Sequence, residues 1–253
     1  MKTIVITGAG SGMGAATAKR LSQNPNHRII LIGRNEVSLQ RTYAEMASPS
    51  NHVVLPVDIT KADDLRKALS QAIGESTIEC VFANAGVGGE NAYGENDRWN
   101  EIIQINLTGT YNTIMECYPY MQRSQEKFKH ILITSSCLAR FGVPNYTAYC
   151  TAKTGLLGLT RSLAVQWARE YILVNAITPG WVETDMAKAG IQLLANRAGS
   201  TYEESFNEQM GYVPTGRISQ PEEIAAFVEF MFSGNQNSIT GQALDINNGS
   251  YMQ

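Results

Sequence analysis

Tyr149 and Lys153 are the residues whose types and spacing most directly suggest acid–base chemistry in this sequence. They stand four positions apart at the start of a helical pattern, so their side chains share one face of the predicted helix. A free tyrosine titrates at about pH 10 and is a poor base at neutrality. An ammonium about 4 Å away contributes about 4 kcal/mol at an effective dielectric of about 20, enough to bring the phenol close to neutral pH. A Tyr-x-x-x-Lys pair alone is a common coincidence, so its surroundings decide its meaning.

Polar residues at two strand ends and in one helix support a reaction centre. Ser136 follows a predicted strand thirteen residues before Tyr149, and its hydroxyl can donate to a substrate carbonyl as negative charge develops. The turn Asn84-Ala85-Gly86 ends the preceding strand, where it can border a cofactor. Asn106 interrupts the apolar helical segment 102–107. A buried amide there needs a partner, so Asn106 is either a satisfied core residue or part of a proton path.

A glycine-rich turn follows the first predicted strand, with the sequence Thr7-Gly8-Ala9-Gly10-Ser11-Gly12-Met13-Gly14. Glycines let the backbone approach a pyrophosphate, and the following helix supplies free N–H groups and a positive dipole. The more common Gly-x-Gly-x-x-Gly pattern would need glycine where Met13 stands, and no Gly-Lys-Ser/Thr follows as in a P-loop. The position after the first strand nevertheless predicts a dinucleotide site.

The end of the second predicted strand indicates which nicotinamide cofactor binds. An NAD site places a carboxylate about 20 residues after the glycines to bind the ribose hydroxyl. Gly33 and Arg34 occupy that region here, and a guanidinium can bind a 2′-phosphate through charge-assisted bonds. We therefore expect NADP(H), with NAD(H) as the other possibility. Alternatively, Arg34 is a solvated loop residue neutralised by Glu36.

Short apolar runs alternate with helical patterns along the whole chain, without repeats or linkers. This alternation predicts a single-domain α/β Rossmann-type fold: a doubly wound parallel sheet of about seven strands with helices on both faces. Ligands in such sheets bind beyond the carboxyl ends of the strands, where the motifs above fall. The predicted strands are Thr3–Thr7, Arg28–Ile32, Val53–Val57, Ile78–Ala83, His130–Thr134, Leu173–Ile177 and Ala243–Ile246, and the clearest helices are Gly12–Ser22, Ala62–Ile73, Trp99–Met121 and Tyr149–Arg169.

One segment, 186–216, breaks the alternation because it is long and polar and lacks a strand pattern. A segment of that length inside a compact domain is usually a lid or a binding element, although a surface insertion would look the same. The 253 residues fit one domain, which at this size buries about three quarters of its unfolded surface. We therefore expect one dinucleotide-binding domain over 1–253 with a substrate lid at about 186–216.

Composition excludes several other classes of protein. Hydrophobic residues make up 43% and charged residues 17%, as in an ordinary globule, and the net charge of −3 argues against nucleic-acid or anionic-membrane partners. No apolar run is long enough to cross a bilayer, and the first residues form a strand pattern rather than a signal peptide, so we expect a cytoplasmic protein. The histidines and cysteines are too scattered for a metal site, and the cysteines are expected to be reduced, buried residues.

These motifs together resemble the short-chain dehydrogenase/reductase family, in its single-domain branch. The resemblance spans nearly the whole chain. Within the family, the overall pattern of the sequence is most similar to that of the 3-oxoacyl and polyketide ketoreductases. It rests on Thr7-Gly8-x-x-x-Gly12-x-Gly14, Asp58, Asn84-Ala85-Gly86, Asn106, Ser136, Tyr149-x-x-x-Lys153 and Pro179-Gly180, in this order.

The resemblance implies a role for each matching residue. Tyr149 would exchange the proton, Ser136 would orient the carbonyl, Lys153 would hold the nicotinamide ribose and lower the tyrosine pKa, and Asn106 would hold a water that joins Lys153 to solvent. Besides the glycine turn, Tyr149 and Lys153, the implied cofactor contacts are Asp58, Ile59, Asn84, Ala85, Gly86, Pro179, Gly180, Val182 and Thr184.

Two departures from the family pattern stand out. Met13 replaces the usual isoleucine, which is a conservative change, and Asn247-Asn248-Gly249 replaces Asp-Gly-Gly in a region that often supports a subunit contact. The resemblance implies a homotetramer or homodimer, and the changed turn lies where the family often forms a subunit contact. The expected reaction is interconversion of a ketone and a secondary alcohol. The alternatives are an NAD-dependent alcohol dehydrogenase of the same family and a non-catalytic NADP-binding regulator.

Overall fold

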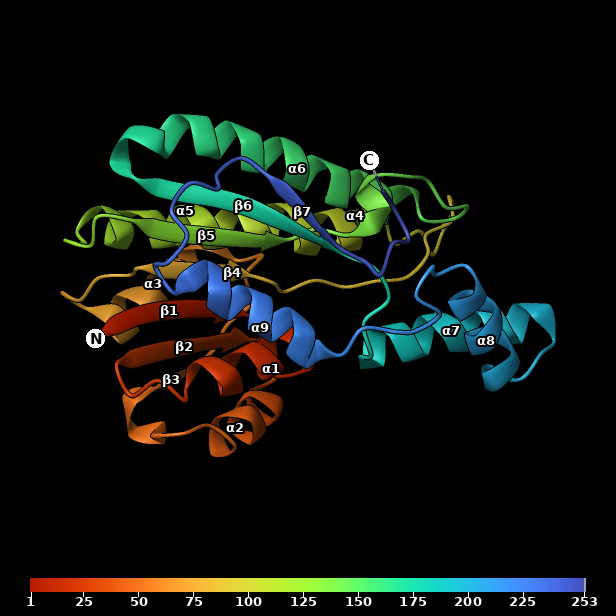
Figure 1. Ribbon diagram of the computed structural model, residues 1–253, viewed down its shortest axis with the longest axis horizontal. Helices are drawn as coiled ribbons and strands as arrows, with labels where there is room; N and C mark the ends of the chain where they lie inside the picture. Colours follow the sequence, from red (N-terminus) through yellow and green to blue (C-terminus); the bar gives the residue numbers. More distant parts are fainter. Residues whose placement is uncertain (253) are drawn as a thin grey trace.

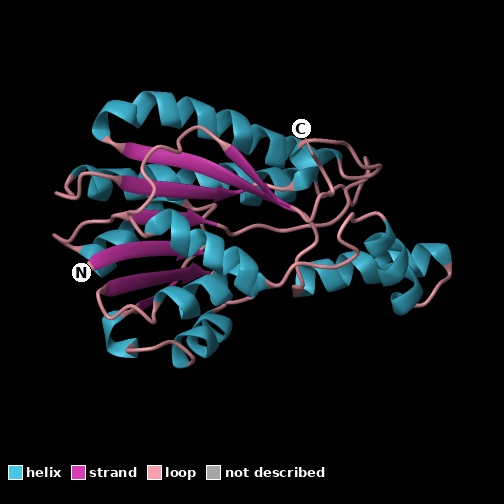
Figure 2. Ribbon diagram, viewed as in Figure 1, coloured by secondary structure: helices cyan, strands magenta, loops and turns pink. Residues whose placement is uncertain are grey.

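The computed structural model describes residues 1–252, which form a seven-stranded, wholly parallel sheet with helices on both faces (Figures 1 and 2). The strand order is β3-β2-β1-β4-β5-β6-β7, so the direction of winding reverses between β1 and β4. The predicted strands are confirmed with small shifts at their ends: β1 (Lys2–Thr7), β2 (His27–Gly33), β3 (Val53–Pro56), β4 (Cys80–Ala83), β5 (Lys129–Thr134), β6 (Ile172–Pro179) and β7 (Ala243–Ile246).

Alternating strand residues build two separate cores because successive side chains point to opposite faces. Val5 of β1 belongs to the core under α3 (Ala62–Ile73), α5 (Gly109–Gln122) and α6 (Thr147–Trp167). Its neighbours Ile4 and Ile6 belong to the core under α1 (Gly12–Leu21) and α9 (Pro221–Phe232). Burial on both faces explains why the strands are continuously apolar.

The predicted helix Trp99–Met121 is divided in the structure. It consists of α4 (Trp99–Ile103), a π-helical turn η2 (Gln104–Thr108) and α5, which ends at Gln122. The remaining helical elements outside the 186–216 segment are α2 (Glu36–Ala44) and the short 3₁₀ turns η1 (Pro49–Asn51), η3 (Cys137–Ala139) and η4 (Ala168–Glu170).

The segment expected to be a lid is helical, which the sequence patterns did not predict. It contains α7 (Asp185–Ala198) and α8 (Tyr202–Gly211), which project beyond the carboxyl ends of the strands (Figure 1). A parallel bridge between Val182 and Ser219 brings the two ends of the segment together. The α7–α8 unit therefore leaves and rejoins the domain at one place.

The structure also bears on the membrane and cysteine expectations. Among residues 1–252, none of the helices combines the length and apolarity that crossing a bilayer requires. All four cysteines are free: Cys80 and Cys117 are buried, whereas Cys137 and Cys150 are partly exposed.

Candidate active site

The glycine turn between β1 and α1 is too closely packed for side chains. Gly8 has a φ of +67°, and a Cβ on Gly14 would lie 2.2 Å from the Gly8 carbonyl oxygen. Within residues 1–252, the side chain of the N-cap residue Ser11 makes no capping bond, so the first N–H groups of α1 are not taken up by it. The turn thus offers a backbone cradle and a helix N-terminus, which fits a pyrophosphate.

Thr7, for which the sequence predicts no role, joins this turn to the end of β4. Its hydroxyl oxygen accepts hydrogen bonds from the backbone N–H groups of Asn84 and Ala85, each at 3.0 Å. Asn84 also donates its side-chain amide to the Thr7 carbonyl at 3.1 Å. The predicted cofactor residues 84–86 are therefore fixed against the glycine turn.

Arg34 stands exposed just after β2. Within the described chain its guanidinium forms no salt bridge, so neutralisation by Glu36 is not observed. The pKa of Glu101 on α4 is lowered, chiefly by a hydrogen bond from Arg98 and to a smaller extent by the charge of Arg34. Arg34 is thus a free cation near the nucleotide end of the sheet.

Asp58 and Ile59 follow β3 and are held by local bonds. The Asp58 carboxylate accepts from the Thr60 N–H and hydroxyl, both at 2.9 Å, which shapes the approach to α3. Ile59 is buried, and its carbonyl accepts from the Asn112 side chain at 3.0 Å.

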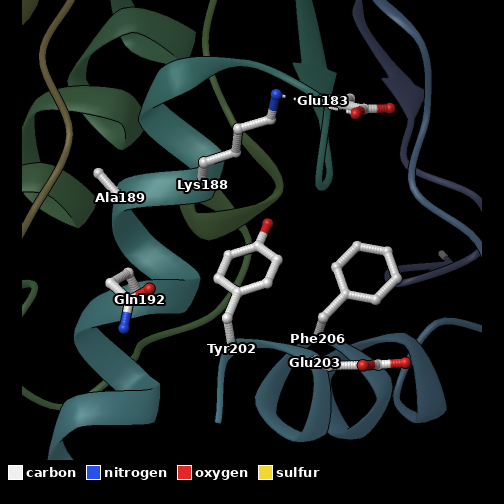
Figure 3. Close-up of a pocket in the computed structure, with 7 residues that line it drawn as sticks. All are labelled: Glu183, Lys188, Ala189, Gln192, Tyr202, Glu203 and Phe206. Carbon is white, nitrogen blue, oxygen red and sulfur yellow. Dashed lines mark ion pairs between the residues drawn. The ribbon is translucent and has the colours of Figure 1, made fainter.

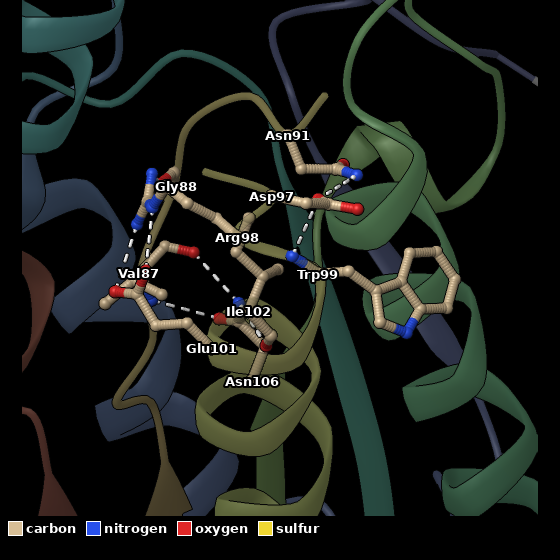
Figure 4. A network of polar contacts seen from close by, with 9 residues as sticks. All are labelled: Val87, Gly88, Asn91, Asp97, Arg98, Trp99, Glu101, Ile102 and Asn106. Carbon is tan, nitrogen blue, oxygen red and sulfur yellow. Dashed lines mark hydrogen bonds and ion pairs between the residues drawn. The ribbon is translucent and has the colours of Figure 1, made fainter. Parts of the chain in front are cut away.

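Asn106 in the π-helical turn is fully buried and clamps the backbone of Val87 (Figure 4). Its amide nitrogen donates to the carbonyls of Val87 at 2.9 Å and Ile102 at 3.0 Å, and its oxygen accepts from the Val87 N–H at 3.1 Å. Of the two interpretations offered by the sequence, the side chain fits the satisfied core amide. The water-holding role implied by the resemblance stays a prediction.

Lys153, Tyr149 and Ser136 converge where β5 ends beside the first turns of α6. The Lys153 ammonium is buried, donates to the Thr134 carbonyl at 2.8 Å, and lies 5.6 Å from the centre of the Tyr149 ring. Ser136 caps η3, where its oxygen accepts from the Leu138 N–H at 3.2 Å. A Cβ on Gly86 would lie 3.5 Å from the Lys153 ammonium and 2.5 Å from the Asn106 side-chain oxygen, so the four predicted catalytic residues border one region.

The pKa values in this region differ from the sequence expectation. Burial raises the pKa of Tyr149 to about 12, while the facing Ser136 hydroxyl acts in the opposite direction. Burial also lowers the pKa of Lys153 to about 8. Desolvation of the phenolate is the largest influence on the Tyr149 pKa, and the Lys153 ammonium is bonded to the Thr134 carbonyl. The lowering of the tyrosine pKa by Lys153 that the resemblance implies stays a prediction.

The segment after β6 lies against the glycine turn. Gly180 donates its N–H to the Ile246 carbonyl at 3.3 Å, and Val182 is buried beside its bridge to Ser219. Thr184 caps α7 by accepting from the Ala187 N–H at 3.3 Å. Its methyl group would lie 3.0 Å from a Cβ on Gly12, so residues Pro179 to Thr184 close one side of the predicted nucleotide site.

Two cavities lie beside this region. A cavity of about 670 Å³ separates α7 from α8 (Figure 3), where Tyr202 and Phe206 stack at 6.3 Å opposite Ala189 and Gln192. It is not lined by any of the four predicted catalytic residues. A second, polar cavity of about 380 Å³ borders the glycine turn, and Lys19 and Arg41, which the sequence did not single out, help to line it.

Comparison with known proteins gives a consistent result over the whole chain. The sequence model of a family described as enoyl-(acyl carrier protein) reductase matches residues 8–251. A 3-oxoacyl-[acyl-carrier-protein] reductase from Rickettsia prowazekii is 30% identical, with 99% of this chain and 97% of that protein covered. A variant of actinorhodin polyketide ketoreductase solved with NADPH is 26% identical with a TM-score of 0.91, covering 98% and 97% of the two chains. Levodione reductase is 25% identical with a TM-score of 0.89, covering 98% and 96%.

Proposed function

We propose that this chain, which belongs to the short-chain dehydrogenase/reductase family, is an NADPH-dependent reductase that converts a ketone into a secondary alcohol. The observation that carries the proposal is the convergence of Ser136, Tyr149 and Lys153 at the carboxyl end of β5, beside a glycine turn shaped for a pyrophosphate. The reductases to which the chain is similar support the same reaction class.

The preference for NADPH rests on the chain's own residues. The backbone cradle of Gly8, Gly12 and Gly14 would hold the pyrophosphate, and the exposed Arg34 would bind the 2′-phosphate. The solved relative that contains NADPH supports this assignment. When bound, the cofactor supplies the hydride for the carbonyl carbon.

The residues of the chain supply the proton and the polarisation. Because the pKa of Tyr149 is raised to about 12, its hydroxyl keeps its proton at neutral pH and can donate it to the carbonyl oxygen. The Ser136 hydroxyl, which faces the same phenol, would orient that oxygen and stabilise its developing charge. Lys153 has a pKa of about 8, so it carries a positive charge at neutral pH that favours the negative oxygen.

The substrate we propose is a ketone with a hydrophobic body, such as a β-keto ester or a cyclic ketone. Three apolar residues of α7 and α8 support this choice: Met186 is exposed near Gly88, and Tyr202 and Phe206 line the large cavity. Apolar and aromatic residues on the lining of a binding site favour such ligands, and the charged residues Glu183, Lys188 and Glu203 line the same cavity.

Replacing Tyr149 with phenylalanine tests the proposal. Loss of the proton donor should lower kcat about 10²–10⁴-fold while NADPH binding is retained. Tyr118→Phe is the matched control, because the pKa of Tyr118 is likewise raised to about 12 but its hydroxyl bonds Glu170 at the far end of α6. NADPH oxidation measured by absorbance over a panel of ketones and β-keto esters, with NADH alongside, gives the rates.

The outcomes separate the rival functions. Near-normal turnover by Tyr149→Phe contradicts the mechanism. Higher kcat/KM with NADH than with NADPH favours the NAD-dependent alcohol dehydrogenase. Tight NADPH binding without turnover of any ketone or alcohol favours a non-catalytic regulator.

A further inference from the structure

Helix α6 carries both Tyr149 and Lys153, yet its first turn is not capped by the residue that precedes it. Tyr146 occupies the N-cap position and makes no side-chain capping bond within residues 1–252. The first N–H groups of a helix need acceptors, and short-range capping usually supplies them. The acceptor here comes from a distant part of the chain.

That acceptor is the side-chain oxygen of Asn91, in the loop between β4 and α4. It accepts hydrogen bonds from the Ala148 N–H at 2.8 Å and from the Thr147 hydroxyl at 3.1 Å. Ala148 immediately precedes Tyr149, so Asn91 holds the very turn from which the phenol projects. Asn91 is 8% exposed, so its side chain lies largely away from solvent.

The backbone of Asn91 holds the approach to the same helix. Its N–H donates to the Asn145 carbonyl at 2.8 Å. Asn145 has a φ of +66°, a left-handed conformation that asparagine adopts more readily than most residues with a side chain. Asn91 therefore fixes both the turn before α6 and the first turn of the helix.

The orientation of the Asn91 amide is set by Asp97 (Figure 4). The Asn91 nitrogen donates to the Asp97 carboxylate at 3.1 Å, so the oxygen must point towards α6. The same carboxylate oxygen accepts from the Trp99 N–H, the first of α4, at 3.0 Å. The pair joins the starts of two helical segments, one leading to Asn106 and the other carrying Tyr149.

We propose that Asn91 is a positioning residue for the reaction: it caps α6 across the chain and sets the Tyr149 hydroxyl, while Asp97 orients the Asn91 amide. This inference rests on the proposed function for its kinetic consequence, but the capping contact itself does not. It assigns a role in catalysis to Asn91 and Asp97, whose hydrogen bonds among the described residues do not include the glycine turn or the side chains of the four predicted catalytic residues.

The test exchanges the two side chains. Asn91→Asp alone sets two carboxylates against each other at the 3.1 Å contact and Asn91→Ala removes the acceptor, so each should lower kcat about tenfold, with the Kd for NADPH changed less than about twofold. The double variant Asn91→Asp, Asp97→Asn restores the contact between the two side chains with donor and acceptor reversed and keeps the acceptor for Ala148 and Thr147, but it removes the acceptor of the Trp99 N–H. It should therefore recover most, not all, of the kcat that Asn91→Asp loses. In a Tyr149→Phe background, Asn91→Ala should cost less than about twofold, because the group that it positions is gone.

Hydrogen exchange at residues 146–150 supplies a readout that needs no turnover. Exchange there should accelerate in Asn91→Ala and return to the wild-type rate in the double variant. Glu223→Ala is the control for general destabilisation, since it removes an acceptor at the start of α9, on the opposite face of the sheet. It should leave kcat unchanged.

Each failure points to a different error. The proposal is overturned if the double variant is no better than Asn91→Asp, if Asn91→Ala is equally harmful in the Tyr149→Phe background, or if Glu223→Ala lowers kcat as strongly. If no ketone is turned over by the wild type, the proposed function fails, and the exchange experiment still decides whether Asn91 caps α6.

Discussion

At the scale of single residues, Lys153 carries a charge that loses most of its hydration when the protein folds. Its ammonium is buried, and the described chain offers it one hydrogen-bond acceptor, the Thr134 carbonyl. Its pKa falls from 10.5 to about 8, so at intermediate pH the unfolded chain binds a proton that the folded protein does not. The free energy of unfolding therefore rises as the pH rises from about 8 to 10.5, and the full penalty is present below about 8.

Removing this charge should stabilise the protein while ending its activity. Lys153→Met eliminates a penalty of about 3 kcal/mol at pH 7, in proportion to the lowered pKa, part of which is offset by the unpaired Thr134 carbonyl. We expect Tm to rise by about 5 °C in thermal denaturation at pH 7 and ketone reduction to be lost. A Tm equal to or below that of the wild type would show that contacts in the folded protein offset the free-energy cost of burying the ammonium.

Arg34 permits a prediction about cofactor choice. Arg34→Leu removes the guanidinium expected to bind the 2′-phosphate, so kcat/KM with NADPH should fall about 10–100-fold, as for a lost hydrogen bond to a charged group. Steady-state rates with NADH should change less than about twofold. Arg161→Leu removes an exposed arginine on α6 and serves as the control. An equal loss of kcat/KM with both cofactors would mean that Arg34 does not bind the 2′-phosphate of NADPH.

At the scale of elements, the helical stretch from Trp99 shows what periodicity can and cannot predict. The pattern correctly indicates a helix and marks Asn106 as an anomaly. In the π-helical turn, the side-chain amide of Asn106 donates to the Ile102 carbonyl four residues earlier, an acceptor that a regular α-helix would use for a backbone N–H. The amide is held there by Val87, and that tertiary contact has no local signal in the sequence.

The helices α7 and α8 did carry local signals. Thr184 caps α7, Gly199 ends it with a φ of +66°, and Thr201 and Glu204 form a capping box at the start of α8. The apolar residues of this segment are few because each of its two helices is buried on one side only. The hydropathy pattern therefore did not indicate a helix. Capping residues were thus better predictors here than hydropathy.

The glycine turn gives a prediction at this scale, with a matched control in α6. Gly14→Ala would place a Cβ 2.2 Å from the Gly8 carbonyl oxygen, so the turn must move, with a lower Tm and at least about tenfold weaker NADPH binding. Gly158→Ala adds the same atom where nothing lies within 4 Å, and it should stabilise the helix by about 0.5–1 kcal/mol. Calorimetry and NADPH titration of both variants provide the measurement. Unchanged NADPH affinity in Gly14→Ala would remove the turn from the proposed site.

At the scale of the whole molecule, the parallel sheet was predictable because its strands are buried on both faces and separated by helical patterns. The placement of Tyr149, Lys153 and Ser136 near one another followed from strand ends and helix spacing. The Tyr149 pKa did not follow, because it depends chiefly on burial in the folded protein and on the facing Ser136 hydroxyl. The Asn91 cap also has no signal in the sequence, since it joins residues more than fifty positions apart.

His130 in β5 links overall stability to pH. It is 3% exposed, and burial, assisted by the charge of Lys2 and opposed by the Asn237 side chain, lowers its pKa from 6.5 to about 4. The unfolded chain binds the proton first as the pH falls. The stability contributed by neutral His130 is therefore present above about 6.5 and lost as the pH falls towards 4.

His130→Leu should flatten this acid response. Between pH 7 and pH 4.5 the wild type should lose about 2 kcal/mol more unfolding free energy than the variant, as its lowered pKa requires. Urea unfolding at the two pH values measures the difference. Parallel losses in both proteins would assign acid sensitivity to other groups.

The bridge between Val182 and Ser219 has a consequence for how such an enzyme diversifies. Because the α7–α8 unit departs and returns at one point, its length and sequence can change without lengthening any path through the sheet. Closing a longer loop between two fixed ends costs little, about 0.6 kcal/mol for each doubling. Residues 185–218 can therefore vary while the sheet and the glycine turn keep their geometry, and we expect changes of substrate to arise in this range.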